Sequence, residues 1–193
     1  MARARRKTIV VRSAPALIAV EGVNAAALLA SAREALAGVD RRRRSGVSHW
    51  DASGIFGDLA AAEDSAGRPS PRTILLLYAA DLAFRIRWEI RPLLDGGKSV
   101  VAAPYVATAI AFGRAAGISP RWLEDLFSFA PAAAESRLAE STARVGRGRR
   151  GFVECSCELM SGSLNGLSRV ELAETTAAYL RTALGRRARI VNA

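Results

Sequence analysis

The feature that most constrains the fold is a strand–loop–helix unit near the start of the chain, in residues 16–37. Ala16-Leu-Ile-Ala-Val20 is a short apolar run, typical of a strand buried in a parallel sheet. Glu21 and Gly22 follow it, and residues 30–36 have the composition of a helix. Further strands alternate with helices along the chain, so the sequence predicts an α/β protein with a parallel sheet covered on both faces.

The turn after this strand has the outline of a phosphate-binding loop without its chemistry. A P-loop needs glycine, four residues, a second glycine, lysine, and serine or threonine, because its backbone N–H groups cradle phosphate oxygens and its hydroxyl binds Mg²⁺. Counted from Gly22, the last three positions hold Ala27, Leu28 and Leu29. These replacements predict a loop that packs against the protein rather than one that binds anions.

Length and composition favour one α/β domain, residues 15–193, preceded by a basic arm, residues 1–14. The chain has 193 residues, of which 50% are hydrophobic, enough for one substantial core. No apolar run reaches the roughly 18 residues that a membrane span needs. The apolar segment 8–11 is too short for a signal peptide. We therefore expect a cytoplasmic protein with no membrane partner.

The formal net charge of +10 raises the alternative of nucleic-acid binding. Beyond the arm, much of the basic charge lies in Arg41–Arg44 and Arg144–Arg150. Aromatic residues do not alternate with these arginines, so no base-stacking platform is predicted. The pattern favours solvated loops over a nucleic-acid-binding adaptor, which remains a third hypothesis behind the two functions considered below.

Metal binding is not expected either. Cys155 and Cys157 are the two cysteines, and His49 is the one histidine and lies far from them in sequence. Together they cannot supply four Cys and His ligands for a zinc ion. The two cysteines are expected to fill space in a packed segment.

The longest periodic segment covers residues 73–94. Its strong helix formers and apolar spacing predict a long helix whose first half is buried in the core or at a dimer interface. Pro92 is expected to tighten its last turn, and Gly96-Gly97 to end it. The other expected elements are a turn at 38–46, a loop at 48–54, a helix at 55–63, a strand at 98–103, helices at 108–116 and 120–130, a weakly structured stretch at 135–151, a helix at 167–184 and a last strand at 189–191. Residues 152–160 fit a helix or a strand, and the helix is favoured.

Several stretches resemble thymidylate kinases and related nucleoside monophosphate kinases. Glu21-Gly22-Val-Asn24 resembles the opening of their P-loop. Residues 76–81 and 89–94 resemble the helix that carries the family's substrate site, and residues 105–112 resemble the segment around its Asp-Arg-Tyr motif. The resemblance covers residues 16–131. It implies a three-layer P-loop NTPase-like fold, with a central parallel sheet flanked by helices.

The positions that carry the family's chemistry differ in this chain. Ala103-Pro104 stand where the family has the Asp-Arg pair that organises the metal region and the substrate phosphate. Leu82 stands where an arginine contacts the nucleotide base. Losing a single stabilising donor costs on the order of 10²–10³ in rate. With the P-loop lysine and hydroxyl absent as well, we expect little kinase activity.

The leading interpretation is therefore a catalytically impaired relative of thymidylate kinase that serves as a nucleotide- or partner-binding regulatory module, with no certain cofactor. The loop positions implied for a nucleotide are Glu21, Gly22, Asn24, Ala27, Leu28 and Leu29. The side chains expected around a substrate pocket are His49, Trp50, Asp51, Ser53, Arg72, Tyr78, Tyr105 and Phe112. The resemblance also implies a homodimer through helix 73–94, with Leu76, Tyr78, Ala83 and Trp88 as its contacts; a purely internal role for this helix is the alternative.

The main alternative is an active dTMP-type kinase with a relocated site, which would use ATP and Mg²⁺. His49 has the side chain whose ordinary pKa lies near neutrality, and Asp51 and Ser53 stand close to it in sequence. The competing interpretation of this loop is structural: Trp50 anchors it, and Asp51 or Ser53 caps a helix.

Overall fold

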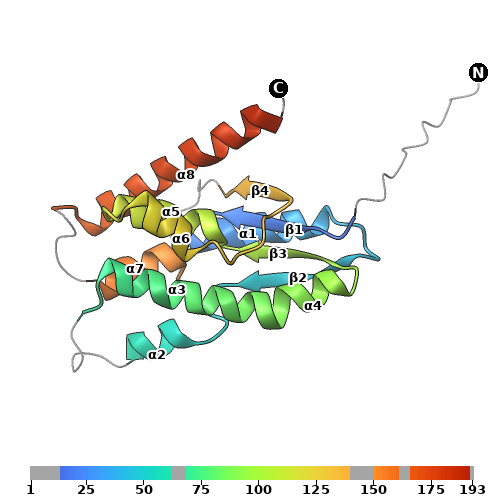
Figure 1. The fold of residues 1–193 in the computed structure, drawn as a ribbon, viewed down its shortest axis with the longest axis horizontal. Coiled ribbons are helices and arrows are strands. Elements are labelled where there is room, and N and C mark those ends of the chain that lie inside the picture. The colour runs from blue at the N-terminus through green and yellow to red at the C-terminus, as the bar shows by residue number, and fades with distance from the viewer. Residues whose placement is uncertain (1–13, 62–67, 140–149, 161–165, 192–193) are drawn as a thin grey trace, which may run out of the picture.

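The computed structural model describes residues 14–61, 68–139, 150–160 and 166–191, which form a parallel sheet flanked by helices (Figure 1). The arm 1–13 and most of Arg144–Arg150 lie outside the described residues. The sheet has four strands in the order β2-β3-β1-β4, and every neighbouring pair is parallel. The strands are β1 (Leu17–Glu21), β2 (Arg44–His49), β3 (Ser99–Ala103) and β4 (Glu135–Leu138).

Alternate residues of the central strands face two different apolar clusters, because successive side chains of a strand point to opposite faces. Ile18 and Val20 of β1 pack in the cluster formed with α1 (Ala25–Ala37). Leu17 and Ala19 pack in the larger cluster on the other face. The helices of that larger cluster are α3 (Pro71–Arg85), α5 (Val106–Ala115), α6 (Pro120–Leu126), α7 (Phe152–Leu159) and α8 (Arg169–Val191). The predicted three-layer α/β fold is confirmed.

The predicted long helix is present as one helical run with a change of winding near its end. After α3 come a π-helix, η1 (Ile86–Ile90), and the short α4 (Arg91–Asp95). The wider turn directly precedes Pro92, which has no N–H to continue the regular hydrogen-bond pattern. The run begins at Ser70, whose Oγ accepts a 3.1 Å hydrogen bond from Thr73 N. It ends at Gly97, whose φ of +74° suits glycine.

Several predicted boundaries and elements are wrong. Residues 44–49 form β2 instead of parts of a turn and a loop, and residues 135–138 form β4 instead of a weakly structured stretch. Both strands are short and largely polar, so the apolar pattern of a strand is missing. Residues 189–191 belong to α8 and not to a strand. Helix α1 begins at Ala25, earlier than expected, so the loop before it is short.

The two helices predicted for the C-terminal part are present. Residues 152–159 form α7, and its Cys155 and Cys157 are free and buried, as expected for packed side chains. A capping box begins α8: Ser168 N donates to Glu171 Oε2 at 2.7 Å, and Glu171 N donates to Ser168 Oγ at 3.3 Å. Helix α2 (Ile55–Ala61) packs outside α3. In the part of the chain that the structure describes, no helix is long and apolar enough to cross a bilayer.

Candidate functional site

The loop after β1 is a tight helix start rather than a wide phosphate cradle. Helix α1 begins at Ala25, only four residues after the end of β1 at Glu21. Asn24 is its N-cap residue, and its Oδ1 accepts a 3.0 Å hydrogen bond from Ala27 N. Ala27 and Leu28 are buried in the cluster between α1 and the sheet. Of the residues expected to line a nucleotide loop, Leu29 is partly exposed, with 37% of its surface accessible.

Glu21 serves as a buried cap for α5. Its carboxylate accepts hydrogen bonds from the backbone N–H groups of Tyr105 (3.1 Å), Ala107 (3.0 Å) and Thr108 (2.9 Å) and from Thr108 Oγ1 (2.6 Å). Burial raises the pKa of Glu21, and the hydrogen bonds from Thr108, Ala107 and Tyr105 oppose that rise. Because it meets donors from the first turn of α5, this carboxylate satisfies groups that a helix start leaves unpaired.

The chain's own backbone and a carboxylate occupy the space at the start of α1. A Cβ added to Gly22 would lie 3.1 Å from Ala139 Cβ, and one added to Gly151 would lie 3.3 Å from Ala25 N. Glu154 of α7 accepts hydrogen bonds from Gly151 N at 2.7 Å and from Asn24 Nδ2 at 3.3 Å. The N-terminus of the helix after the first strand is where a P-loop holds phosphate. Here a glutamate side chain lies beside that position.

Three of the predicted pocket residues come together, and a fourth aromatic ring fills the space between them. Trp50, Tyr78 and Phe112 all have ring centroids close to that of Phe152, at 6.0, 4.3 and 5.2 Å. Phe56 adds a further contact at 5.9 Å. Phe152 is the first residue of α7 and is only 1% exposed. The aromatic cluster is therefore packed by the protein itself.

Tyr78 and Tyr105 support this cluster through their hydroxyl groups. Tyr78 OH donates to Tyr105 O at 2.9 Å, and Tyr105 OH donates to Pro131 O at 2.8 Å. Burial raises the pKa of both phenols, so both stay protonated at neutral pH. Each hydroxyl holds a loop carbonyl in place.

The loop that carries His49 and Asp51 is built around helix caps. Asp51 Oδ1 accepts from Phe56 N at 2.8 Å and its Oδ2 from Gly57 N at 3.2 Å, at the start of α2. Ser53 donates its backbone N–H (3.0 Å) and its hydroxyl (2.9 Å) to one oxygen of Asp81. The half-buried His49 ends β2.

Arg72 and Tyr105 lie in different surroundings from that loop. The guanidinium of Arg72 lies 5.9 Å from the ring centroid of Trp122 on α6. Tyr105 belongs to the hydrogen-bond network around Glu21. The eight residues expected around one pocket are thus divided among the aromatic cluster, a helix-capping loop and the α6 surface.

Sequence reasoning did not identify a buried polar network on α3. Arg85 is fully buried: its Nε donates to Ser48 Oγ at 3.0 Å and its Nη2 to Ser48 O at 2.8 Å. Ser48 Oγ donates in turn to Glu89 Oε2 at 2.6 Å. Asp81 is also fully buried and lies one turn before Arg85. Asp81 and Arg85 are four residues apart and share a helix face with Tyr78. This spacing indicates that both side chains point inward.

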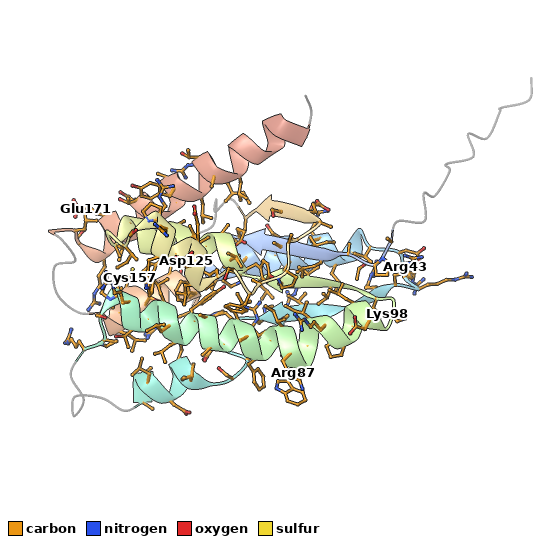
Figure 2. All side chains as sticks on the ribbon, in the orientation of Figure 1. Arg43, Arg87, Lys98, Asp125, Cys157 and Glu171 are labelled. Atoms are coloured by element: carbon orange, nitrogen blue, oxygen red, sulfur yellow. The ribbon has the colours of Figure 1, made fainter. Side chains whose placement is uncertain are left out.

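The basic turn lies at the other end of the sheet from these residues. Figure 2 shows Arg43 and Lys98 at one end of the molecule and Cys157 of α7 at the opposite end. Lys98 Nζ donates to Arg42 O at 2.8 Å, which ties the turn to the start of β3. The turn precedes β2, so it lies at the amino ends of the strands, whereas Glu21 and His49 lie at the carboxyl ends.

Metal ligands do not gather in the described ranges. No group of three or more His, Cys, Asp or Glu side chains there is placed to hold an ion. Burial raises the pKa of both Cys155 and Cys157 to about 11. At neutral pH these thiols are therefore protonated, which makes them poor nucleophiles and poor metal ligands.

Comparison with known proteins relates the chain to thymidylate kinases. Over 56 residues it is 41% identical to a probable thymidylate kinase of Pyrococcus abyssi, which covers 29% of this chain and 27% of that protein. It is 40% identical over 55 residues to one from Thermococcus gammatolerans (28% and 26%). It is 27% identical over 114 residues to a probable thymidylate kinase 2 of Saccharolobus solfataricus (59% and 54%). These matches span from about a quarter to about half of the relatives' length.

The fold agrees with this relationship. A crystal structure of thymidylate kinase from Ehrlichia chaffeensis superposes with a TM-score of 0.55 and 14% sequence identity, over 66% of this chain and 72% of that one. No protein-family model matches the sequence. The predicted resemblance to thymidylate kinases is confirmed, by sequence over part of the chain and by fold.

Proposed function

We propose that this thymidylate kinase-like chain does not transfer phosphoryl groups and works as a binding module. The observation that supports the proposal is the packed start of α1, where Glu154 and Gly151 of the chain itself lie beside the place that a P-loop uses for phosphate. A nucleotide phosphate there would meet a carboxylate instead of a lysine. Phosphoryl transfer depends on positioning and on charge stabilisation at this point, so both requirements fail together.

The packed aromatic cluster supports the same proposal. A nucleobase needs a planar gap between side chains, and Phe152 already fills the gap between Tyr78 and Phe112. Moving Phe152 out of this gap would expose its ring, which is almost fully buried. Neither the phosphate position nor the aromatic cluster is open without displacing α7.

The experiment is an assay of dTDP formation from dTMP and Mg²⁺-ATP with the purified chain, beside an authentic thymidylate kinase. The proposal expects no dTDP above the rate without protein. An unrelated protein purified from the same host identifies activity that comes from a contaminating kinase. Mg²⁺-dependent dTDP formation proportional to this chain, and absent from that control, would refute the proposal.

The binding surface that we propose is the outer face of α3 and η1, used by two copies of the chain. Leu76, Phe84 and Trp88 are exposed there by 52%, 40% and 65%, at spacings of eight and four residues on one helix face. Ala83, also expected at a dimer interface, is exposed. Tyr78, named with them from the sequence, is fully buried inside the core and has no place in such an interface.

Sedimentation equilibrium tests this dimer directly. The proposal expects a dimer at micromolar concentration, and a monomer for Trp88→Glu, because a charge at the centre of an apolar interface is left unpaired. Arg121→Glu, at an exposed site on α6, is the matched control and keeps the dimer. A wild-type chain that remains monomeric up to about 100 μM, roughly a hundred times the micromolar range of a modest interface, would contradict the proposed interface.

A further inference from the structure

A groove of about 780 Å³ opens between α5, α8 and the segment that leads into β4. This volume lies within the range of about 300–1,000 Å³ that is typical of small-molecule sites. Its walls are mostly apolar, with Ile110, Ala111, Ala130, Ala133, Ala183 and Leu184 among them. In Figure 1, α8 slants away from the sheet towards the C-terminus.

Small side chains keep this groove open. Residues 130–134 contribute four alanines and one proline to its wall, and α5 and α8 contribute further alanines. The aromatic cluster differs, because there Phe152 projects into the middle of the other rings. None of Trp50, Phe112 and Phe152 lines the groove, whereas Tyr105 and Phe127, which both contact Tyr78, lie between the two regions.

The groove has one cation positioned for a ligand. Arg114 is exposed and lies 4.6 Å from the ring centroid of Tyr179, which holds its guanidinium at the groove wall. Neither ion pair found among the described residues involves Arg114. Glu135 also lines the groove, but Arg137 neutralises it at 2.6 Å. Arg114 is therefore the one cation among the described residues that line the groove.

Glu21 also lines the groove, beside the first turn of α5. Its carboxylate already accepts four hydrogen bonds, one of them from Ala107 N at 3.0 Å. Ala107, Ile110, Ala111 and Arg114 follow one face of α5, and two helical turns separate the first from the last, about 10 Å. An anion is thus favoured at the Arg114 end and disfavoured at the Glu21 end.

We propose that this groove binds a small organic monoanion with an apolar body about 10 Å long, on the scale of two turns of α5. Its carboxylate or sulfonate pairs with Arg114 beside the Tyr179 ring, and its apolar body lies along Ile110, Ala111 and Leu184. A nucleotide fits poorly, because it carries several charges and a polar sugar while the groove offers one cation and a largely apolar wall. The site is independent of the phosphate position at α1 and of the function proposed above.

Anilinonaphthalene sulfonate is a suitable probe, since it joins an apolar body to one anion and its fluorescence rises on binding. The proposal expects saturable binding of one equivalent to the folded chain. Arg114→Gln should weaken this binding by about tenfold or more, as expected for a lost charge-assisted hydrogen bond. Ala183→Phe, which fills the groove from α8, should abolish it.

Matched controls distinguish binding at this groove from nonspecific binding of the probe to apolar surface. Arg181→Gln and Val170→Ala, both at exposed sites of the same helix α8 and outside the groove, should leave the affinity unchanged. The uncharged phenylnaphthylamine should bind the wild type and Arg114→Gln equally and lose binding in Ala183→Phe. Binding that is not saturable, that survives both groove substitutions, or that falls equally in Arg181→Gln overturns the proposal.

Discussion

The start of α1 and the groove beside α5 lie on either side of the same residue, Glu21, and they have opposite character. At the start of α1, a Cβ added to Gly22 would crowd Ala139, one added to Gly151 would crowd Ala25, and Glu154 accepts a hydrogen bond from Asn24 Nδ2. In the groove, the walls are small and no side chain fills about 780 Å³. The start of α1, where a P-loop would hold phosphate, is tightly packed, and the groove, which Tyr105 also lines, is open.

This difference indicates that side-chain volume and free polar groups decide where this protein can bind a ligand. The position of a site in proteins of similar fold decides it less. At the start of α1, the polar groups of Glu21, Asn24 and Glu154 all have partners. Arg114 at the groove has an aromatic neighbour but no acid among the described residues. The same fold can therefore bind a ligand at the groove while the start of α1 is packed.

The largest expected effect is the loss of the ring that closes the aromatic cluster. Phe152→Ala should lower the free energy of unfolding by about 3–5 kcal/mol, because it leaves a cavity among four other rings. Phe129→Ala, at a ring that is 42% exposed, is the matched control and should cost less than about 1 kcal/mol. Urea unfolding measures both. Equal losses for the two variants would mean that Phe152 does not fill a packed centre.

Glu21→Gln should destabilise the protein by roughly 2 kcal/mol at neutral pH, since an amide NH₂ would face backbone donors. The effect depends on pH. Because burial raises the folded-state pKa of Glu21 above its ordinary value of 4.5, wild-type stability falls as the pH rises through that folded pKa. The wild type should therefore gain stability relative to Glu21→Gln as the pH falls towards 4.5. Denaturant titrations from pH 4 to pH 8 test this; a stability difference independent of pH would contradict it.

Gly151→Ala should cost about 1 kcal/mol through overpacking at the start of α1. The added methyl group would lie 3.3 Å from Ala25 N and 3.3 Å from Glu154 Oε2. Gly46→Ala is its matched control, because nothing lies within 4 Å of a Cβ there. Thermal unfolding should separate the two variants by a few degrees. If Gly151→Ala proves as stable as Gly46→Ala, the start of α1 is more open than described.

The smallest effect belongs to the groove. Ala133→Leu should change the free energy of unfolding by less than about 0.5 kcal/mol, because its larger side chain enters open space. Ala109→Leu, at a fully buried position of α5, should cost about 1–3 kcal/mol by overpacking. Denaturant unfolding of both measures how open the groove is. A large loss for Ala133→Leu would contradict an open groove.

Much of the fold follows from local patterns in the sequence. The apolar runs of β1 and β3 and the long periodic helix predicted the central strands and α3. The polar strands β2 and β4 could not be predicted in this way, because their side chains lack an apolar strand pattern. They are strands because they pair with β3 and β1. Strand propensity is weak evidence where neighbouring strands decide the conformation.

The site was predictable only in part. The missing lysine and hydroxyl at Leu28 and Leu29 are visible in the sequence, but what replaces them in space is not. Phe152 and Glu154 come from a segment about 130 residues beyond the loop, and only the tertiary structure brings them to Asn24 and Tyr78. The groove was invisible for the same reason, since alanine runs predict helix or strand but not the space between them.

The central claim is that the chain's own residues close the phosphate position at α1, and a calorimetric titration of ATP with and without Mg²⁺ tests it most directly. We expect no binding heat with either form up to about 1 mM, a concentration at which even weak sites become occupied. Phe152→Ala, if folded, provides a second sample in which the aromatic cluster is open but Glu154 is kept. Micromolar, Mg²⁺-dependent binding of ATP to the wild-type chain would contradict the account.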